Sequence, residues 1–238
     1  PQSIKPTQLD QLLAMGWFRM GQSIFTTNYI MFNRQIFRTI WLRHVLKNYT
    51  ESSTLQKLKK RNKALRIVIC KAQIDDAHET LFELYKSSIE FEAASSLEQL
   101  LNGYVFVPAQ IYNTYEVNLY DGDQLIGCSY FDIGQKSAEG ISAYFDPAYK
   151  AQSPGRYMIY LQIEFCKAQG FDFYYPGYFV PGYPHLDYKL HIGTDCLEYL
   201  DVEDGCWYPI GEFKNDTQHF DLLEFDTDHE EAGLPEIE

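Results

Sequence analysis

The chain has 238 residues, with 33 acidic side chains against 20 Lys and Arg, and its formal net charge is −13 at pH 7. An apolar fraction of 45% with 22% charged residues is typical of a globular protein with ample core material. No apolar run approaches the roughly 20 residues needed to span a bilayer, and the first residues lack the basic and apolar regions of a secretory signal. We therefore expect a soluble, cytoplasmic protein.

Five cysteines are dispersed along the chain without any Cys-x-x-Cys pair: Cys70, Cys128, Cys166, Cys196 and Cys206. An odd, dispersed set is typical of reduced thiols in a cytosolic protein. The sequence therefore predicts neither a disulfide framework nor a metal site.

Positive charge is concentrated at the start of the chain. Residues 1–71 contain 13 Lys and Arg and two acidic residues, whereas residues 72–238 hold 7 Lys and Arg and 31 acidic residues. Such asymmetry indicates a polyanionic partner for the basic part. From charge alone, nucleic acid, an anionic membrane surface and internal pairing with the acidic remainder all stay open.

The predicted elements of the first half follow from caps and hydrophobic periodicity. In chain order they are a helix over 7–16, a helix over 50–63, a strand over 64–72, a helix over 74–91 and a short helix over 95–103. Gly16 ends the first helix, and Ser52 or Ser53 caps the second one. Residues 17–49 mix aromatic and basic side chains and predict no regular element.

The second half predicts more strands. In chain order we expect a hairpin over 115–134, a strand that begins at residue 137 and stops at Pro147, a helix over 154–170, a strand over 171–180 broken by Pro176-Gly177, and short strands over 196–201 and 206–210. The hairpin turns at Asp121-Gly122, and the helix has Pro154 at its start and Gly170 after its end. From Asp216 onward the chain is acidic, which predicts a solvated tail.

The order hairpin, strand, helix, strand predicts an α/β (α+β) fold of the GNAT-like acyltransferase kind, with a mixed central sheet. We expect a basic N-terminal subdomain over 1–71, the transferase domain over 72–215 and the acidic tail over 216–238. In such a fold, the loop before the central helix binds an anionic acyl carrier through backbone N–H groups and the positive end of the helix.

An ordered set of residues supports a closer assignment. Its C-terminal members are Tyr144, Asp146, Pro147, Tyr149, Ser153, Gly155, Glu164, Tyr175, Gly177, Tyr178, Tyr188 and Lys189, and its earlier members are Gly16, Arg19, Gly21, Arg43, Val45, Tyr49, Ser52 and Asn62. This set resembles the motifs of arginyl-tRNA–protein transferases and of their bacterial leucyl-transferring relatives. The resemblance spans most of residues 12–210.

Two departures from the family pattern stand out. The family carries cysteines before its basic segment that hold a metal or iron–sulfur cluster, whereas residues 1–69 of this chain contain none. Because such sites need thiolates, we expect no cluster there. Tyr183 stands where the family tends to have Cys, and His185-Leu186 where it tends to have Lys-Met.

The resemblance implies an enzyme that moves an arginyl or leucyl group from an aminoacyl-tRNA to the α-amine of a protein N-terminus, without a metal or other cofactor. The ester is already activated, so positioning, deprotonation of the amine and oxyanion stabilisation suffice. Phosphate contacts come chiefly from Lys and Arg. The expected tRNA-binding residues are Arg19, Arg34, Arg38, Arg43, Lys57, Lys59, Lys60, Arg61 and Lys63.

The expected catalytic residues are Asp146, Glu164, Tyr178 and Tyr188. The expected substrate-binding residues are Tyr144, Tyr149, Gln152, Ser153, Gly155, Arg156, Tyr175, Tyr183 and Lys189. Each has a structural alternative: a turn cap for Asp146, an ion pair for Glu164, core packing for the tyrosines and a surface position for Lys189. His185 and His191 are not expected to bind metal.

Two other functions compete with this one. A GNAT enzyme could use acyl-CoA, and a relative without catalysis could bind tRNA or proteins that carry degradation signals. The loop from Gln152 to Tyr157 is an imperfect GNAT pyrophosphate pattern, in which Tyr157 replaces the final small residue. We expect that tyrosine to crowd a CoA pyrophosphate, which favours a tRNA acceptor end.

Overall fold

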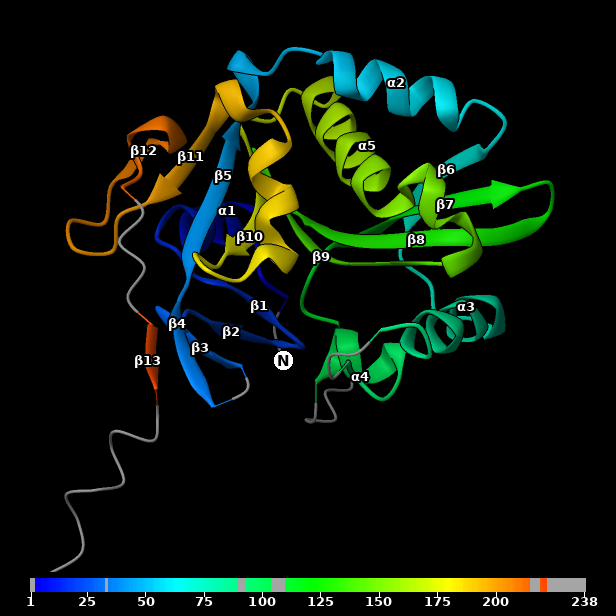
Figure 1. Cartoon of the computed structure of the whole chain (residues 1–238), viewed down its shortest axis with the longest axis horizontal. Helices are drawn as coiled ribbons and strands as arrows, with labels where there is room; N and C mark the ends of the chain where they lie inside the picture. The colour runs from blue at the N-terminus through cyan, green and yellow to red at the C-terminus, as the bar shows by residue number, and fades with distance from the viewer. Residues whose placement is uncertain (1–2, 33, 90–92, 104–109, 215–218, 222–238) are drawn as a thin grey trace, which may run out of the picture.

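A computed structural model describes residues 3–32, 34–89, 93–103, 110–214 and 219–221 (Figure 1). Its centre is one eight-stranded sheet in the order β12-β11-β5-β10-β9-β8-β7-β6. In chain order these strands are β5 (Ile40–Val45), β6 (Arg66–Lys71), β7 (Thr114–Asp121), β8 (Gln124–Ile133), β9 (Ser137–Phe145), β10 (Phe173–Phe179), β11 (Leu197–Leu200) and β12 (Trp207–Pro209). β10 runs parallel to β9, and the other neighbouring pairs are antiparallel, so the predicted mixed sheet is confirmed.

Smaller elements complete the described chain. The helices are α1 (Pro6–Ala14), α2 (Ser53–Arg61), α3 (Asp76–Lys86), α4 (Leu97–Asn102) and α5 (Pro154–Ala168), with 3-10 turns η1 (Leu46–Asn48), η2 (Pro147–Gln152), η3 (Pro184–His191), η4 (Thr194–Cys196) and η5 (Ile210–Glu212). The remaining strands are β1 (Phe18–Met20), β2 (Ser23–Phe25), β3 (Tyr29–Phe32), β4 (Gln35–Arg38) and β13 (His219–Asp221). None of the helices in the described ranges is both long and apolar enough to cross a bilayer.

Helices cover both faces of the sheet, with α5 and α2 on one side and α3 and α4 on the other (Figure 1). Met158 and Ile163 of α5 are fully buried in a core with β7 and β8 residues such as Val117 and Phe131. On the opposite face, the α3 and α4 side chains Leu81, Phe82, Leu97 and Leu101 form a second core with β8 and β9. The sheet is therefore the middle layer of three.

The strongly patterned elements lie where the sequence predicts them. The helix expected over 154–170 is α5, which has Pro at its first position and is followed by Gly170 at a φ of +71°. The hairpin expected at Asp121-Gly122 joins β7 and β8. The helix expected over 74–91 is too long, because α3 ends at Lys86; residues 90–92 lie outside the described part of the chain.

Residues 1–71 do not form a separate subdomain. β5 lies between β11 and β10, and β6 is the edge strand of the same sheet. The sequence of β5, IWLRHV, has no period-2 alternation because the strand is covered on both faces, which explains why residues 17–49 predicted no element. Most of the acidic tail expected over 216–238 lies outside the described residues.

The two parallel strands separate part-way along their length, and we call this point the fork. Pairing between β9 and β10 ends at Glu139 and Tyr175. Pro176 follows and has no N–H to donate, and the register of β10 against β5 shifts between Tyr174 and Gly177. Beyond the fork, β10 stays paired with β5 while β9 stays paired with β8.

A buried ion pair fastens the N-terminal segment to this sheet. The side chain of Arg19 on β1 is 1% exposed, and its Nη1 lies 2.9 Å from Oδ1 of Asp132 on β8. The same Nη1 donates to Thr114 Oγ1 at 2.8 Å, and Nε donates to the Gly21 carbonyl at 2.6 Å. The prediction that Arg19 contacts tRNA is wrong, because its guanidinium is enclosed by the protein itself.

The Arg19→Met variant should lower the free energy of unfolding by about 3–5 kcal/mol, because it leaves the buried Asp132 carboxylate without its partner. Urea denaturation measures the change, with Arg66→Met as the control, since Arg66 is an exposed arginine on β6. The double variant Arg19→Met/Asp132→Leu should recover part of the loss. A loss below about 1 kcal/mol for Arg19→Met would contradict the assigned role.

Candidate functional site

A cavity of about 260 Å³ opens at the fork. Glu139, Gly140 and Ile141 of β9 line one side, while Pro176, Gly177 and Tyr178 of β10 line the other. Its remaining lining residues are Phe18, Arg19, Phe25, Trp41, Leu186 and Lys189. The cavity thus lies where β9 and β10 no longer form hydrogen bonds with each other. Such a gap between parallel strands is a favourable place for a ligand.

An aromatic wall forms the apolar side of the cavity. The rings of Phe18 and Trp41 are stacked with centroids 3.6 Å apart and an interplanar angle of 6°. Phe25 and Tyr178 meet the Trp41 ring edge-on, at 5.7 and 4.9 Å. Trp41 is held in place by a hydrogen bond of 2.9 Å from its Nε1 to the Thr27 carbonyl. This rigid wall can bind an apolar side chain.

Glu139 contributes a buried carboxyl group. It is 2% exposed, and its Oε2 accepts a long hydrogen bond of 3.4 Å from the Arg19 backbone N–H. Its Oε1 makes no hydrogen bond to the part of the chain that the structure describes. Burial, together with the nearby Asp132 carboxylate, raises the pKa of Glu139 well above its ordinary value. A carboxyl with a raised pKa holds a proton more tightly than an exposed glutamate does, which makes its ionised form a stronger base.

Lys189 contributes the cation. It projects from η3, and its Nζ donates to the Tyr178 carbonyl at 2.8 Å and lies 5.5 Å from the centroid of the Tyr178 ring. Burial lowers the pKa of Lys189 from 10.5 to about 8. Gly177 has a φ of +87°, a conformation that favours glycine, and a Cβ there would lie only 3.3 Å from Lys189 Nζ. Both the backbone conformation and the limited space therefore favour glycine at this position.

The cavity brings together two of the residues expected in the site, Tyr178 and Lys189. Tyr175 is buried beside the cavity, with its ring against Trp207. The hydroxyl of Tyr144 lies 3.1 Å from that of Tyr130 in the core under α3, and Tyr183 stacks on Phe32 at 4.4 Å. These tyrosines pack against other aromatic rings rather than line the cavity.

Tyr188 and Glu164 also lie away from the cavity. Tyr188 packs against the core beneath α5, and its burial raises the pKa of the hydroxyl to about 12. Glu164 is half-exposed, and its carboxylate lies 3.6 Å from Lys59 Nζ of α2. Glu164 therefore forms an ion pair, which was the structural alternative to its catalytic role. Neither Glu164 nor Tyr188 is placed for catalysis at the fork.

A second group of expected residues gathers around the start of α5. Asp146 caps η2 by accepting from the Ala148 N–H at 2.9 Å, and the Tyr149 hydroxyl donates to Asp121 at 2.7 Å. Ser153 has a φ of +56°, and Gly155 faces the Phe145 ring. The Nε of Arg156 is buried without a hydrogen bond to the described residues. This group shapes the loop before α5 rather than the cavity.

The expectation that Tyr157 crowds a CoA pyrophosphate, and so disfavours acyl-CoA as the donor, is wrong. The Tyr157 side chain is 4% exposed and belongs to the core between α5 and the sheet. It is therefore not exposed at the loop, where it would have to lie in order to crowd a bound pyrophosphate. Gln152 takes part in the loop through its backbone, because its carbonyl accepts from Asn62 Nδ2 of the segment after α2 at 3.1 Å.

The expected tRNA-binding cations do not form one surface. Arg43 is enclosed by an ion pair of 2.7 Å to Glu198 and lies over the rings of Phe173 and Trp207. Arg34 and Arg38 belong to the β3–β4 hairpin, which lies at the opposite side of the molecule from α2 (Figure 1). Lys59 pairs with Glu51 at 2.9 Å. The exposed cations on and after α2 are Lys57, Lys60, Arg61 and Lys63.

Sequence reasoning missed most of the cavity. Glu139 stands in the middle of the SAEGIS segment, where no motif or unusual spacing marks it. Phe18 and Trp41 lie in the mixed aromatic and basic stretch over 17–49, for which the sequence predicts no regular element. The one available signal was Pro176-Gly177, which breaks the strand where the fork forms. These residues meet through the pairing of distant strands, which one sequence does not reveal.

Comparison with known proteins places the chain. Residues 77–197, more than half of the chain, match the family model described as the C terminus of arginine-tRNA-protein transferase. The protein belongs to this family. It is therefore an aminoacyltransferase with a GNAT-like α/β fold, as predicted.

Relatives with curated names agree with this placement. An aspartate/glutamate leucyltransferase of Helicobacter hepaticus is 26% identical over 194 residues, which cover 79% of this chain and 78% of the relative. One of Leptospira interrogans is 27% identical over 149 residues, covering 61% and 58%. One of Paracoccus denitrificans is 31% identical over 106 residues, covering 44% and 36%.

Solved structures resemble the chain more distantly. The C-terminal domain of a lysylphosphatidylglycerol synthetase from Agrobacterium fabrum has a TM-score of 0.45 and 10% identity, covering 74% of this chain and 53% of that one. A GCN5-related glucosamine N-acetyltransferase region of a fungal β-N-acetylglucosaminidase has a TM-score of 0.39 and 10% identity, covering 64% and 20%.

The lowered pKa of Lys189 predicts a pH dependence of stability. Between about pH 8 and the ordinary lysine pKa, the unfolded chain binds the proton more often than the folded one, so the free energy of unfolding contributed by Lys189 rises with pH. Lys189→Met should be more stable than the parent at neutral pH, and the difference should shrink as the pH rises. Urea denaturation across this pH range measures it, with exposed Lys63→Met as the control. Parallel curves for parent and Lys189→Met would contradict the assignment.

Proposed function

We propose that this protein transfers a leucyl group from leucyl-tRNA to the α-amine of proteins that begin with Asp or Glu. The observation that carries the proposal is the fork cavity, in which one aromatic wall, one lysine and one buried carboxyl group face the same space. Membership in the family supplies the reaction class, and the printed names of the relatives supply the donor and acceptor.

The cavity has a surface of suitable chemistry for each group that the reaction brings together. Phe18, Phe25 and Trp41 offer an apolar surface for the leucyl side chain. Lys189, which pairs with no carboxylate among the residues described, offers a cation for the acidic side chain of the acceptor. The free edge of β9 beyond Glu139 offers backbone donors for the oxyanion.

Glu139 is the candidate proton acceptor. The acceptor amine reaches the enzyme as an ammonium, and Glu139 takes one proton to leave a nucleophile. The nitrogen attacks the ester carbonyl, and the intermediate collapses as the bond to the ribose oxygen breaks. The second proton on the nitrogen leaves as the amide forms, and the ribose oxygen gains one. The raised pKa makes the ionised form of Glu139 a stronger base than an ordinary glutamate, so Glu139 must bind the substrate amine in its deprotonated form.

The tRNA is proposed to dock on the cations of α2 beside the start of α5. Arg61 donates from Nη1 to the Ala151 carbonyl at 2.9 Å and lies 3.5 Å from Ser153 Oγ. This contact fixes the cationic end of α2 against the loop where α5 begins, and the first N–H groups of a helix favour anions. Because aminoacyl-tRNA is a cytoplasmic substrate, the proposal also implies a cytoplasmic location.

A transfer assay tests the proposal directly. Peptides beginning with Asp, Glu, Lys or Arg are incubated with radiolabelled Leu-tRNA, Arg-tRNA or acetyl-CoA. We expect incorporation from Leu-tRNA into the Asp and Glu peptides. Incorporation from Arg-tRNA would change the donor, incorporation from acetyl-CoA alone would replace the function by acyl-CoA transfer, and no incorporation from any donor would favour a binding protein without catalysis.

Variants in the same assay test the role of Glu139. Glu139→Gln should lower kcat by about 10²- to 10⁴-fold, the usual contribution of a general base. Glu164→Gln is the matched control, because that carboxylate lies on the outer side of α5 beside Lys59. Equal losses in both variants, or none in Glu139→Gln, would remove Glu139 from the reaction.

The tRNA surface has its own test. The triple variant Lys57→Gln/Lys60→Gln/Lys63→Gln should reduce the slope of log affinity against log salt by about 2 to 3, since each lost phosphate contact removes nearly one unit. Fluorescence anisotropy with uncharged tRNA measures the slope. Arg34→Gln/Arg38→Gln on the distant hairpin is the control. An equal change in both variants would move the docking surface away from α2.

A further inference from the structure

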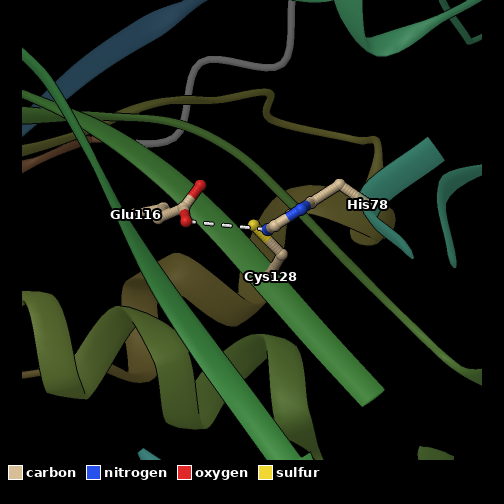
Figure 2. A group of neighbouring side chains, drawn as sticks. All are labelled: His78, Glu116 and Cys128. Atoms are coloured by element: carbon tan, nitrogen blue, oxygen red, sulfur yellow. Dashed lines mark ion pairs between the residues drawn. The ribbon is translucent and has the colours of Figure 1, made fainter. Parts of the chain in front are cut away.

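A buried cluster of potential metal ligands lies outside the cavity, under α3 (Figure 2). His78 comes from α3, Glu116 from β7 and Cys128 from β8. Their ligand atoms all lie within 4.8 Å of one another, and the three side chains point toward a common centre. The three residues are 4%, 1% and 0% exposed. The proposed transfer reaction uses none of them.

The imidazole of His78 is oriented as in a metal site. Its Nδ1 donates to Asp75 Oδ1 at 2.7 Å, and Asp75 is itself fixed because it caps α3 by accepting from the Ala77 and His78 N–H groups. This bond leaves the lone pair on Nε2, which makes no hydrogen bond within the described chain. A histidine that binds a metal through one ring nitrogen usually donates a hydrogen bond from the other ring nitrogen to a carboxylate.

Glu116 and Cys128 complete a three-ligand set with His78, and Cys70 lies beside Glu116, outside the 4.8 Å that joins the ligand atoms of the other three. Glu116 Oε1 lies 3.6 Å from His78 Nε2, close to the spacing of about 3.3 Å that two such ligands have around zinc. Cys70, on β6, places its Sγ 3.5 Å from the same oxygen. Gln73 N–H and Asn118 Nδ2 hold the Glu116 carboxylate in place at 3.0 and 2.8 Å.

We propose that His78, Glu116 and Cys128 bind a structural zinc ion that ties α3 to the sheet, and that Cys70 turns toward the ion as the fourth ligand. A set of one nitrogen, one oxygen and two sulfur donors suits zinc rather than calcium or magnesium, which prefer oxygen alone. Four protein ligands leave no open position, so the ion supports the fold and does not take part in transfer. The cysteines are 58 residues apart in sequence, which hid the site from motif analysis.

The competing occupant of the cluster is a proton on His78. Although burial alone lowers it, the neighbouring Cys128, Glu116 and Asp75 side chains together raise the pKa of His78 to about 11 in the metal-free cluster. A zinc ion must displace this proton, so binding should release protons and weaken at low pH. The experiment therefore has to distinguish a bound ion from an imidazolium paired with Glu116.

The test uses the full chain stripped with chelator and titrated with Co²⁺ and then with Zn²⁺. We expect one Co²⁺ per chain, a thiolate-to-cobalt charge-transfer band, displacement of Co²⁺ by Zn²⁺ and a rise in Tm with zinc. Cys128→Ser and His78→Ala should abolish the band, and Cys70→Ser should weaken it. Cys166→Ser is the matched control, because Cys166 is equally buried but lies in the α5 core.

Two results would overturn the proposal. One is the absence of a cobalt–thiolate band and of any zinc-dependent change in Tm in the parent protein. The other is binding that is equal in Cys128→Ser, Cys70→Ser and Cys166→Ser, which would place the ion elsewhere. Should Cys128→Ser or His78→Ala fail to fold, Cys70→Ser decides the question, because Cys70 is only partly buried on the edge strand β6.

Discussion

The separation of β9 from β10 is the constraint on which the rest of the site depends. Two parallel strands that stayed paired along their full length would fill the space between them with backbone hydrogen bonds. Pro176 cannot donate to such a ladder, and the register of β10 against β5 shifts at this point. The cavity is therefore a property of the backbone, and side chains only decide what it can hold.

Two buried carboxyl groups that face each other on β8 and β9, Asp132 and Glu139, have different surroundings. Asp132 has the Arg19 guanidinium and the Thr114 hydroxyl as partners, so its charge is compensated. Glu139 shares only a long backbone contact and lies close to Asp132. Burial raises the pKa of both carboxyl groups, and the Arg19 guanidinium opposes this rise more strongly at Asp132, with which it forms an ion pair. Such a contrast between neighbouring carboxyls is a feature of sites that move protons.

The sequence predicted those parts of the molecule whose signals are local. α5 has a proline at its first position and a glycine after its end, and the β7–β8 hairpin has Asp-Gly at its turn. The family motifs include Tyr178 and Lys189, and both residues line the cavity. In these cases the signal and the structure lie within a few residues of each other.

What the sequence did not predict depends on contacts between distant segments. Arg19 was grouped with other cations because its partner Asp132 is 113 residues away. Glu164 was expected in catalysis because its helical neighbours are apolar, but it lies opposite Lys59 of α2. Charge counts likewise hid the fact that Arg43 has its own acidic partner in Glu198. In each case the sequence does not show which strand or helix packs against the residue, and that neighbour determines the residue's partner.

The position of β5 has a consequence for how the chain folds. This strand is formed by residues near the start of the chain, yet both of its neighbours in the sheet, β10 and β11, come from the last third. Val45 pairs with Phe173, and His44 pairs with Leu197. During synthesis the hairpin of β7 and β8 can form early, whereas β5 stays unpaired until the ribosome has released most of the chain. Closure of the longest loops, and with it the assembly of the cavity, should be the slow step.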